Sequence, residues 1–242
     1  MRNPLWKLAV FTAFCSQPTT ASILDTSEFT CPLDGEVFEA TTAMSGTSWG
    51  QRFDLKQLGP IYQPWPKPKC PTSGFVMYRD NFSEAELNAL KTFIWSDHYQ
   101  QLKTKHTPHF LAALTEEKLG TKGWPVVWLY LQATWETDGT DGPQQVSYLE
   151  KLKEVLSLYV DGLEAGSDEW LTGKLLLANT QRRLGHFVSA IAEVRDLQPS
   201  YEQDEDTYVK DMLARFIEIA EAKDTRPRGI TAESDQYLED SE

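Results

Sequence analysis

Positive charge is in short supply in this sequence. Its 242 residues include 23 lysines and arginines against 36 aspartates and glutamates, which gives a formal net charge of −13. Proteins that bind nucleic acids or anionic lipids neutralise phosphates with clustered lysines and arginines, and the sequence has no such run. The composition therefore argues against both as general partners, and we expect no nucleic-acid function.

Long apolar runs and catalytic motifs are also missing. No segment approaches the roughly 20 apolar residues that span a bilayer, so we expect no integral membrane segment in the mature protein. The sequence contains no G-x-S-x-G, H-E-x-x-H or glycine-rich phosphate-binding motif. What is present, 40% hydrophobic and 12% aromatic residues, is typical of a globular protein with a core.

Histidine is scarce as well, with four in the whole chain. His106 and His109 are candidate metal ligands, with His98 one helix earlier, but Pro108 indicates a turn, where solvated polar residues are common. His186 has no such neighbours. We therefore assign no catalytic residues and expect no cofactor.

The first 21 residues have the features of an export signal. Arg2 and Lys7 supply the positive charge, residues 8–15 form a short apolar run, and small residues precede a cleavage site before Ser22. We expect residues 1–21 to be a signal peptide and the mature protein to be periplasmic or secreted.

Cys15 is the residue of this segment that a lipoprotein would acylate. Acylation requires a small residue before the cysteine, and Phe14 is bulky, so we do not expect a lipid anchor. A buried N-terminal helix is the remaining alternative, but Pro18 and the polar residues around it interrupt such a helix.

Two of the three cysteines open the same pattern, Cys-Pro-x-x-Gly, at Cys31–Gly35 and Cys70–Gly74. Written with a second cysteine, this pair is the knuckle pair of a zinc ribbon. Asp34 and Ser73 stand where those second cysteines belong. Because a structural zinc ion takes four ligands, we expect no metal; zinc held by Cys31, Asp34 and Cys70 is the alternative.

The same geometry favours a disulfide between Cys31 and Cys70. Paired knuckles bring their leading cysteines within reach of one metal ion, and in an oxidising compartment the two sulfurs can bond to each other instead. Closing a loop of about 40 residues stabilises a fold by roughly 4 kcal/mol on the chain-entropy model. Two free, buried cysteines are the alternative if the protein stays in the cytosol.

Residues 22–80 are expected to form a degenerate, zinc-ribbon-like β region. Four prolines in residues 59–69 forbid helix and central strand alike and predict an extended, polyproline-like arm. Residues 75–78 are apolar and aromatic and predict a short strand. Tyr62 and Trp65 on the arm are either binding elements or a cover for the sheet.

Residues 81–223 are expected to form a helical body. Ser83 and Glu86 make a capping box, which predicts a helix that begins there and runs to about Lys103. Beyond it, apolar residues recur at helical spacing and are separated by short glycine- or proline-bearing segments.

Consecutive helices with short separators predict antiparallel hairpins. Residues 124–137 and 146–165 form one expected hairpin. A later one has features of a tetratricopeptide repeat, with a turn at Leu184–Gly185 and an Ala-x₃-Phe-like pair in Ala190 and Val194. A plain helical bundle is the alternative.

The order of these features, two Cys-Pro-x-x-Gly knuckles around a short β element followed by a capped helix and tetratricopeptide-like hairpins, resembles the bacterial "domain of unknown function 2225" family over roughly residues 28–222. Asp34 and Ser73 depart from the four cysteines of its ribbon members. The resemblance implies a mainly α fold with a small N-terminal zinc-ribbon-like β element, whose metal is lost here, followed by tetratricopeptide-like α-hairpins. It implies no activity.

The last segment, residues 224–242, has little apolar content and no period, so we expect an acidic, disordered tail. Within it, Tyr237 and Leu238 are either a short recognition motif or part of a solubilising end.

Repeated α-hairpins leave a face that binds proteins or peptides. We therefore expect an exported, non-catalytic binding or scaffold module whose groove uses Trp128, Trp135 and Trp170, each of which is alternatively a core residue. The rival is a periplasmic hydrolase that uses carboxylates in a cleft between the β element and the helical body.

Overall fold

The computed structural model describes residues 22–140, 142–201 and 207–239. The strands are β1 (Ile23–Thr30), β2 (Val37–Ser45), β3 (Gly50–Gln51) and β4 (Gln57–Leu58). The helices are α1 (Glu84–Ile94), α2 (Asp97–Leu102), α3 (Pro108–Lys118), α4 (Trp124–Trp135), α5 (Pro143–Asp161), α6 (Asp168–Arg183), α7 (Phe187–Leu197), α8 (Thr207–Glu221) and α9 (Ala232–Glu239), with a 3₁₀ turn, η1, at Gln198–Tyr201.

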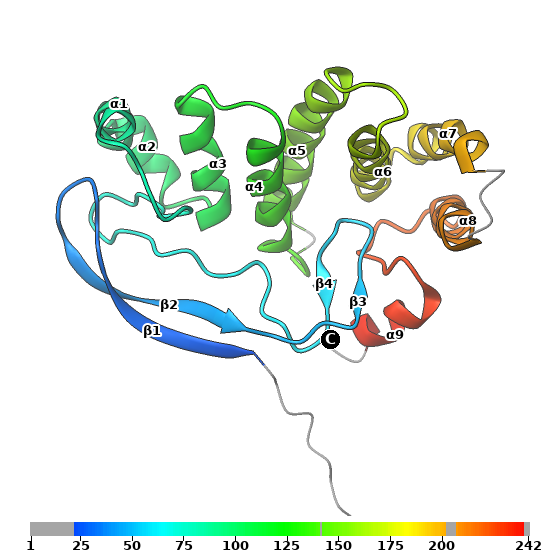
Figure 1. The fold of residues 1–242 in the computed structure, drawn as a ribbon, viewed down its shortest axis with the longest axis horizontal. Coiled ribbons are helices and arrows are strands. Elements are labelled where there is room, and N and C mark those ends of the chain that lie inside the picture. The colour runs from blue at the N-terminus through cyan, green and yellow to red at the C-terminus, as the bar shows by residue number, and fades with distance from the viewer. Residues whose placement is uncertain (1–21, 141, 202–206, 240–242) are drawn as a thin grey trace, which may run out of the picture.

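The fold is mainly α with a small N-terminal β element, as the sequence predicts. Helices α1 to α7 lie side by side in one layer, α8 lies below α7, and the β region runs along one side of that layer (Figure 1). The predicted signal peptide, Cys15 and the acidic stretch at residues 204–206 lie outside the described residues.

The two Cys-Pro-x-x-Gly segments form the same turn. The backbone N–H of Gly35 donates to the carbonyl of Cys31, and that of Gly74 donates to the carbonyl of Cys70, each at 2.9 Å. Gly35 and Gly74 have φ values of 77° and 75°, a region that glycine enters without strain. The repeated pentapeptide is therefore a repeated structure.

The structure pairs Cys31 with Cys70, as the sequence predicts. Their sulfurs are within bonding distance, their Cα atoms are 5.7 Å apart, and both residues are buried. This separation is typical of disulfides. The bond joins the turn between β1 and β2 to the second knuckle.

Strands β1 and β2 form an antiparallel hairpin, and β3 and β4 form a second, much shorter one. In the first, pairing runs from Ile23 opposite Ser45 to Thr30 opposite Val37, with an irregularity between Ile23 and Leu24. The strand predicted at residues 75–78 is not formed. That segment makes a single bridge, between Lys69 and Val76, because its neighbour is the proline-rich arm, which lacks the N–H groups of a ladder.

The best-marked helix start in the sequence is confirmed. The Ser83 side chain accepts from the N–H of Glu86, and the Glu86 carboxylate accepts from the N–H of Ser83, so the capping box is complete. The predicted single helix to Lys103 is wrong, because α1 ends at Ile94. The Ser96 hydroxyl accepts from the N–H of Tyr99 and starts a separate helix, α2.

The expected hairpins are present as the contacting pairs α4 with α5 and α6 with α7. Gly185, at a φ of 81°, makes the tight turn between α6 and α7. That this pair is a tetratricopeptide repeat stays a prediction.

The core has two parts. The larger lies among helices α1 to α6 and extends to the knuckles through Cys31, Cys70 and Phe75. The smaller lies among α6, α7 and α8 and includes Phe53 from the β region, whose ring meets that of Phe216 edge to face at 5.3 Å. The β region therefore contributes to both parts of the core.

The prediction of a disordered tail is wrong for residues 224–239. The carbonyl of Arg228 accepts from the N–H of Phe53 at 3.0 Å, and the N–H of Ile230 donates to the carbonyl of Gln51 at 3.0 Å. Helix α9 follows. Composition alone missed this segment because backbone hydrogen bonds and arginine contacts hold it in place, with Ile230 packed against the smaller part of the core.

Candidate functional site

The β1–β2 hairpin is fixed at both ends. At its tip, next to the disulfide, the Glu36 carboxylate accepts from the N–H and the hydroxyl of Thr72 at 3.0 and 2.9 Å. At its base, the Ser22 hydroxyl donates to the carbonyl of Pro60 and accepts from the N–H of Tyr62 at 2.9 and 2.8 Å. The hairpin is held against the proline-rich arm as a fixed ribbon.

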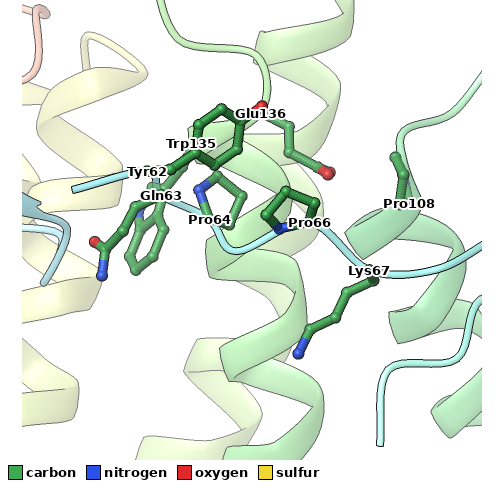
Figure 2. A pocket seen from close by; sticks show the side chains of 8 residues that line it. All are labelled: Tyr62, Gln63, Pro64, Pro66, Lys67, Pro108, Trp135 and Glu136. Atoms are coloured by element: carbon green, nitrogen blue, oxygen red, sulfur yellow. The ribbon is translucent and has the colours of Figure 1, made fainter. Parts of the chain in front are cut away.

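The proline-rich arm, residues 59–69, passes between the hairpin and the helices and leaves a hollow on each side. One hollow, of about 400 Å³, lies against the start of α3 and the end of α4 (Figure 2). The other, of about 310 Å³, lies against the hairpin and includes Phe29, Ala43 and Trp65. Pro66 and Lys67 line both hollows.

Lys67 is the cation of the arm that lines both hollows. It makes no ion pair within the described residues, and burial lowers the pKa of its ammonium group although Asp80 acts in the opposite direction. A half-buried cation without a close counter-ion attracts anions more strongly than a solvated one.

The wall of the first hollow contains a buried polar pair. Glu136 accepts from the backbone N–H of His109 at 3.1 Å and lies 2.8 Å from His109 Nδ1, so it caps the start of α3. His109 is fully buried, contrary to the solvated turn that we expected for residues 106–109. Its Nε2 and the indole N–H of Trp135 are buried without partners among the described residues.

The three tryptophans predicted to line a groove are not brought together. Trp128 and Trp135 contact each other edge to face, with ring centroids 5.4 Å apart, whereas Trp170 lies where the two parts of the core meet. Trp135 is 4% exposed and is covered by the arm, whose residues line the hollow with it. The chain's own β region covers the helical face on which we expected a partner.

Exposed apolar side chains are concentrated on the β region instead. Of the twelve large apolar side chains that are exposed among the described residues, seven lie between residues 23 and 65, in a region that makes up less than a fifth of the sequence. We define the hairpin-base patch as Ile23, Leu24, Met44 and Tyr62, which are 59%, 46%, 62% and 50% exposed. Clustered exposed apolar groups mark interaction surfaces. The sequence analysis identified Tyr62 as a possible binding residue and missed the other three, because periodicity cannot distinguish them from core residues.

Charge is segregated within the β region. Residues 22–45 contain Asp25, Glu28, Asp34, Glu36 and Glu39 and no lysine, arginine or histidine. Residues 55–79, by contrast, contain four cations and no carboxylate. The hairpin is thus an acidic ribbon beside a basic arm.

Two carboxylates between the β region and the helices, Asp54 and Asp138, are held in ion pairs. Asp138, in the α4–α5 connection, pairs with Arg52 at 2.7 Å, Lys56 at 3.0 Å and Arg183 at 3.1 Å. Asp54 pairs with Arg52 and with Arg183. Burial alone would raise the pKa of Asp138, but Arg52, Arg183 and Lys56 outweigh it and hold that pKa well below its usual range.

This arrangement is a structural clamp. It joins the turn between β3 and β4 to α6 and to the α4–α5 connection, and each of its two carboxylates is shared between cations. Neither is placed as a general acid or base facing a hollow. In the hollow between the arm and the helices, Glu136 is the one carboxylate that lines the wall.

The candidate metal ligands are separated by the fold. Cys31 and Cys70 are bonded to each other, and the exposed Asp34 carboxylate accepts from the N–H of Glu36 at 3.1 Å. His106 stacks on Phe110 at 4.4 Å. Within the described part of the chain, no group of three or more such side chains is placed to hold a metal ion.

No protein-family model matches this chain, and neither a curated protein nor a solved structure is matched by it. The resemblance to the "domain of unknown function 2225" family therefore stays a prediction. Across the described ranges, none of the helices combines the length and apolar character that a membrane crossing requires.

Proposed function

We propose that this protein is an exported, non-catalytic module that binds a protein or peptide partner through the outer surface of its β region. The observation that carries this proposal is the hairpin-base patch, four large apolar side chains exposed at the fixed end of the hairpin. Leaving such side chains in water has a cost of roughly 1.5–3 kcal/mol each relative to burial, which a partner surface would remove.

The binding surface differs from the one that the helices alone suggested. The predicted groove residues Trp128 and Trp135 pack into the larger core cluster, and the arm covers Trp135. The β1–β2 hairpin keeps large apolar side chains exposed, and the disulfide and Ser22 hold it at both ends. Rigid surfaces lose less conformational entropy on binding, which supports the β region as the contact surface.

Export is part of the same proposal. The export-like sequence of residues 1–21 and the pairing of Cys31 with Cys70 support an oxidising compartment, because such bonds persist outside the cytosol. The disulfide also fixes the hairpin on which the partner would dock. An oxidising compartment would therefore be needed to keep the binding surface in place.

The test compares two double variants by affinity capture from an envelope extract. Met44→Ser with Tyr62→Ser removes apolar groups from the hairpin-base patch, and Leu158→Ser with Val188→Ser removes groups that are 70% and 86% exposed on α5 and α7. We expect the patch variant to lose at least about tenfold of the captured partner, as hot-spot residues do, and the helix variant to lose none.

Both variants must first match the parent in circular dichroism and in urea denaturation. If the patch variant then captures the same proteins in the same amounts as the helix variant, the patch is not the contact surface and the proposal fails.

A further inference from the structure

The edge of β1 is unpaired within the described part of the chain. The sheet has the order β1–β2, and the backbone of β1 bonds to β2 and to no other described segment. A strand edge of this kind presents a row of N–H and C=O groups to which another strand can pair.

β1 lacks two of the usual protections of an edge strand. Natural edges carry charged side chains, lysine above all, or proline, or bulges that twist them away. β1 contains neither lysine nor proline, its only charged residues are Asp25 and Glu28, and its irregularity lies at its first two positions, so Asp25–Thr30 stays regular. The disulfide at one end and Ser22 at the other hold this stretch in an extended form before any partner arrives.

The outer face of the hairpin carries unneutralised negative charge. Glu28 and Glu39 lie directly opposite each other in the register and are both exposed. Like charges in opposed positions destabilise a sheet. Neither makes an ion pair with a described residue, and residues 22–45 carry five carboxylates and no cation.

We propose that β1 receives an extended, basic segment of the partner as a third strand. Main-chain hydrogen bonds to the free edge supply the pairing, and lysine or arginine side chains beside Glu28 relieve its repulsion with Glu39. A second copy of this chain would bring five more carboxylates to the same edge, which favours a basic partner over self-pairing. This inference rests on the proposed binding function and names its mode and partner chemistry.

The probe is a short fluorescent peptide that alternates valine with lysine, measured by fluorescence anisotropy against the full-length protein. A counterpart with glutamate in place of lysine is the first control. We expect the lysine peptide to bind and the glutamate peptide not to bind. We also expect the amides of β1 to gain protection from hydrogen exchange when the lysine peptide is bound.

Charge reversal tests the assigned residues. Glu28→Lys with Glu39→Lys should weaken binding of the lysine peptide by about tenfold or more, because two favourable pairs become repulsive. Glu164→Lys with Asp196→Lys makes the same change in net charge on exposed helix-end positions and should alter binding by less than about twofold. If the charge reversal impairs folding, Glu28→Gln with Glu39→Gln is the milder variant. It removes both charges and should give an intermediate loss of affinity for the lysine peptide.

A lysine peptide methylated on alternate backbone nitrogens separates strand pairing from charge attraction, because methylation removes donors without changing charge. Equal binding of the methylated peptide, or of the glutamate peptide, would overturn the inference. So would a dimer in sedimentation experiments that protects β1 without peptide, since the occupant would then be a second copy.

Failure of this inference and failure of the proposed function give different results. If the lysine peptide does not bind but the hairpin-base patch variant still loses its captured partner, strand addition is wrong and the binding function stands. If the peptide protects β1 while the patch variant keeps its partner, the edge is a contact surface and the patch is not.

Discussion

At the scale of single residues, the feature that matters most for stability is a group of buried charged side chains. Arg52 and Asp54 are each 3% exposed, and Arg183 is 7% exposed. Such groups are tolerated in a protein interior only when they are paired, and Asp138 completes the pairing from a segment 86 residues away from Arg52 in sequence. Removal of one member therefore leaves charges that the rest cannot neutralise.

Asp138→Asn should lower the free energy of unfolding at neutral pH by about 3 kcal/mol, because Lys56 would lose its ion-pair partner and Asp54 alone would be left to pair with Arg52 and Arg183. Urea denaturation at pH 7 measures this loss. The exposed Asp196→Asn, which alters no ion pair among the described residues, is the control and should change stability by less than about 0.5 kcal/mol. Equal losses in both variants would show that the clamp contributes nothing.

The same carboxylate predicts a pH dependence. The pKa of Asp138 is lowered in the folded state, so its contribution is complete above the unfolded pKa of about 3.9 and is lost as pH falls toward the folded value. Stability should therefore decline as pH falls below about 4, and the decline should be shallower in Asp138→Asn. Parallel pH profiles for the two proteins would contradict the assignment.

The disulfide gives a second prediction at this scale. Cys31→Ala with Cys70→Ala should lower the free energy of unfolding by about 2–4 kcal/mol, because the unfolded chain regains the freedom of a 39-residue loop. A reductant should destabilise the parent by a similar amount and leave the double variant unchanged. A parent that is insensitive to reductant and has both thiols open to alkylation would show that the bond does not form.

At the scale of elements, the C-terminal tail contributes to folding. The Arg182 side chain is fully buried, and its guanidinium donates to the carbonyl of Arg226 at 3.0 Å and to that of Asp224. Arg228 pairs with the carboxylates of Asp224 and Asp235, which belong to the same segment. Without this segment, the buried Arg182 guanidinium loses two carbonyl acceptors and keeps the side chain of Asn179.

Deletion of residues 224–242 should therefore lower the free energy of unfolding by at least about 3 kcal/mol, since an unsatisfied buried charged group costs more than a neutral one. Limited proteolysis and urea denaturation would both report the change. Arg182→Gln is the point variant that should reproduce most of it. Arg195→Gln, which breaks an exposed pair with Glu221, should cost less than about 1 kcal/mol.

Elements with local signals were predictable, and those defined by distant contacts were not. The capping box at Ser83 and the glycine turns at Gly35 and Gly74 depend on neighbours within a few residues, so the sequence reveals them. The end of α1 depends on Ser96, a weaker local signal inside an apolar pattern. The ordered tail depends on hydrogen bonds to Gln51 and Phe53, which no window of sequence contains.

The candidate site shows the same division. The pairing of Cys31 with Cys70 followed from a repeated local pattern. The burial of His109 against Glu136, 27 residues later, and the covering of Trp135 by the arm require the relative placement of α3, α4 and residues 59–69. The sequence therefore predicts the disulfide that fixes the hairpin, but it does not predict that the arm covers Trp135.

At the scale of the whole molecule, the β region and the helical layer have separate tasks. The helices supply most of both parts of the core. The β region lies along one side of them and carries seven of the twelve large apolar side chains that are exposed among the described residues. The arm joins the two, because its prolines pack beside Trp135. A change under the arm should therefore alter stability, whereas a change on the outer hairpin should alter binding.

Trp135 tests this division. Trp135→Ala should lower the free energy of unfolding by about 3–5 kcal/mol, the range for large aromatic side chains removed from a core, and Trp135→Phe should cost less because a ring remains. At a temperature where each variant is folded, capture of the partner should equal that of the parent, because Trp135 lies beneath the arm. The Met44→Ser and Tyr62→Ser variant should do the opposite, with stability kept and capture lost. If Trp135→Phe instead keeps its stability and loses the partner, the arm must leave the helices during binding, and the contact surface would be the helical face that it covers.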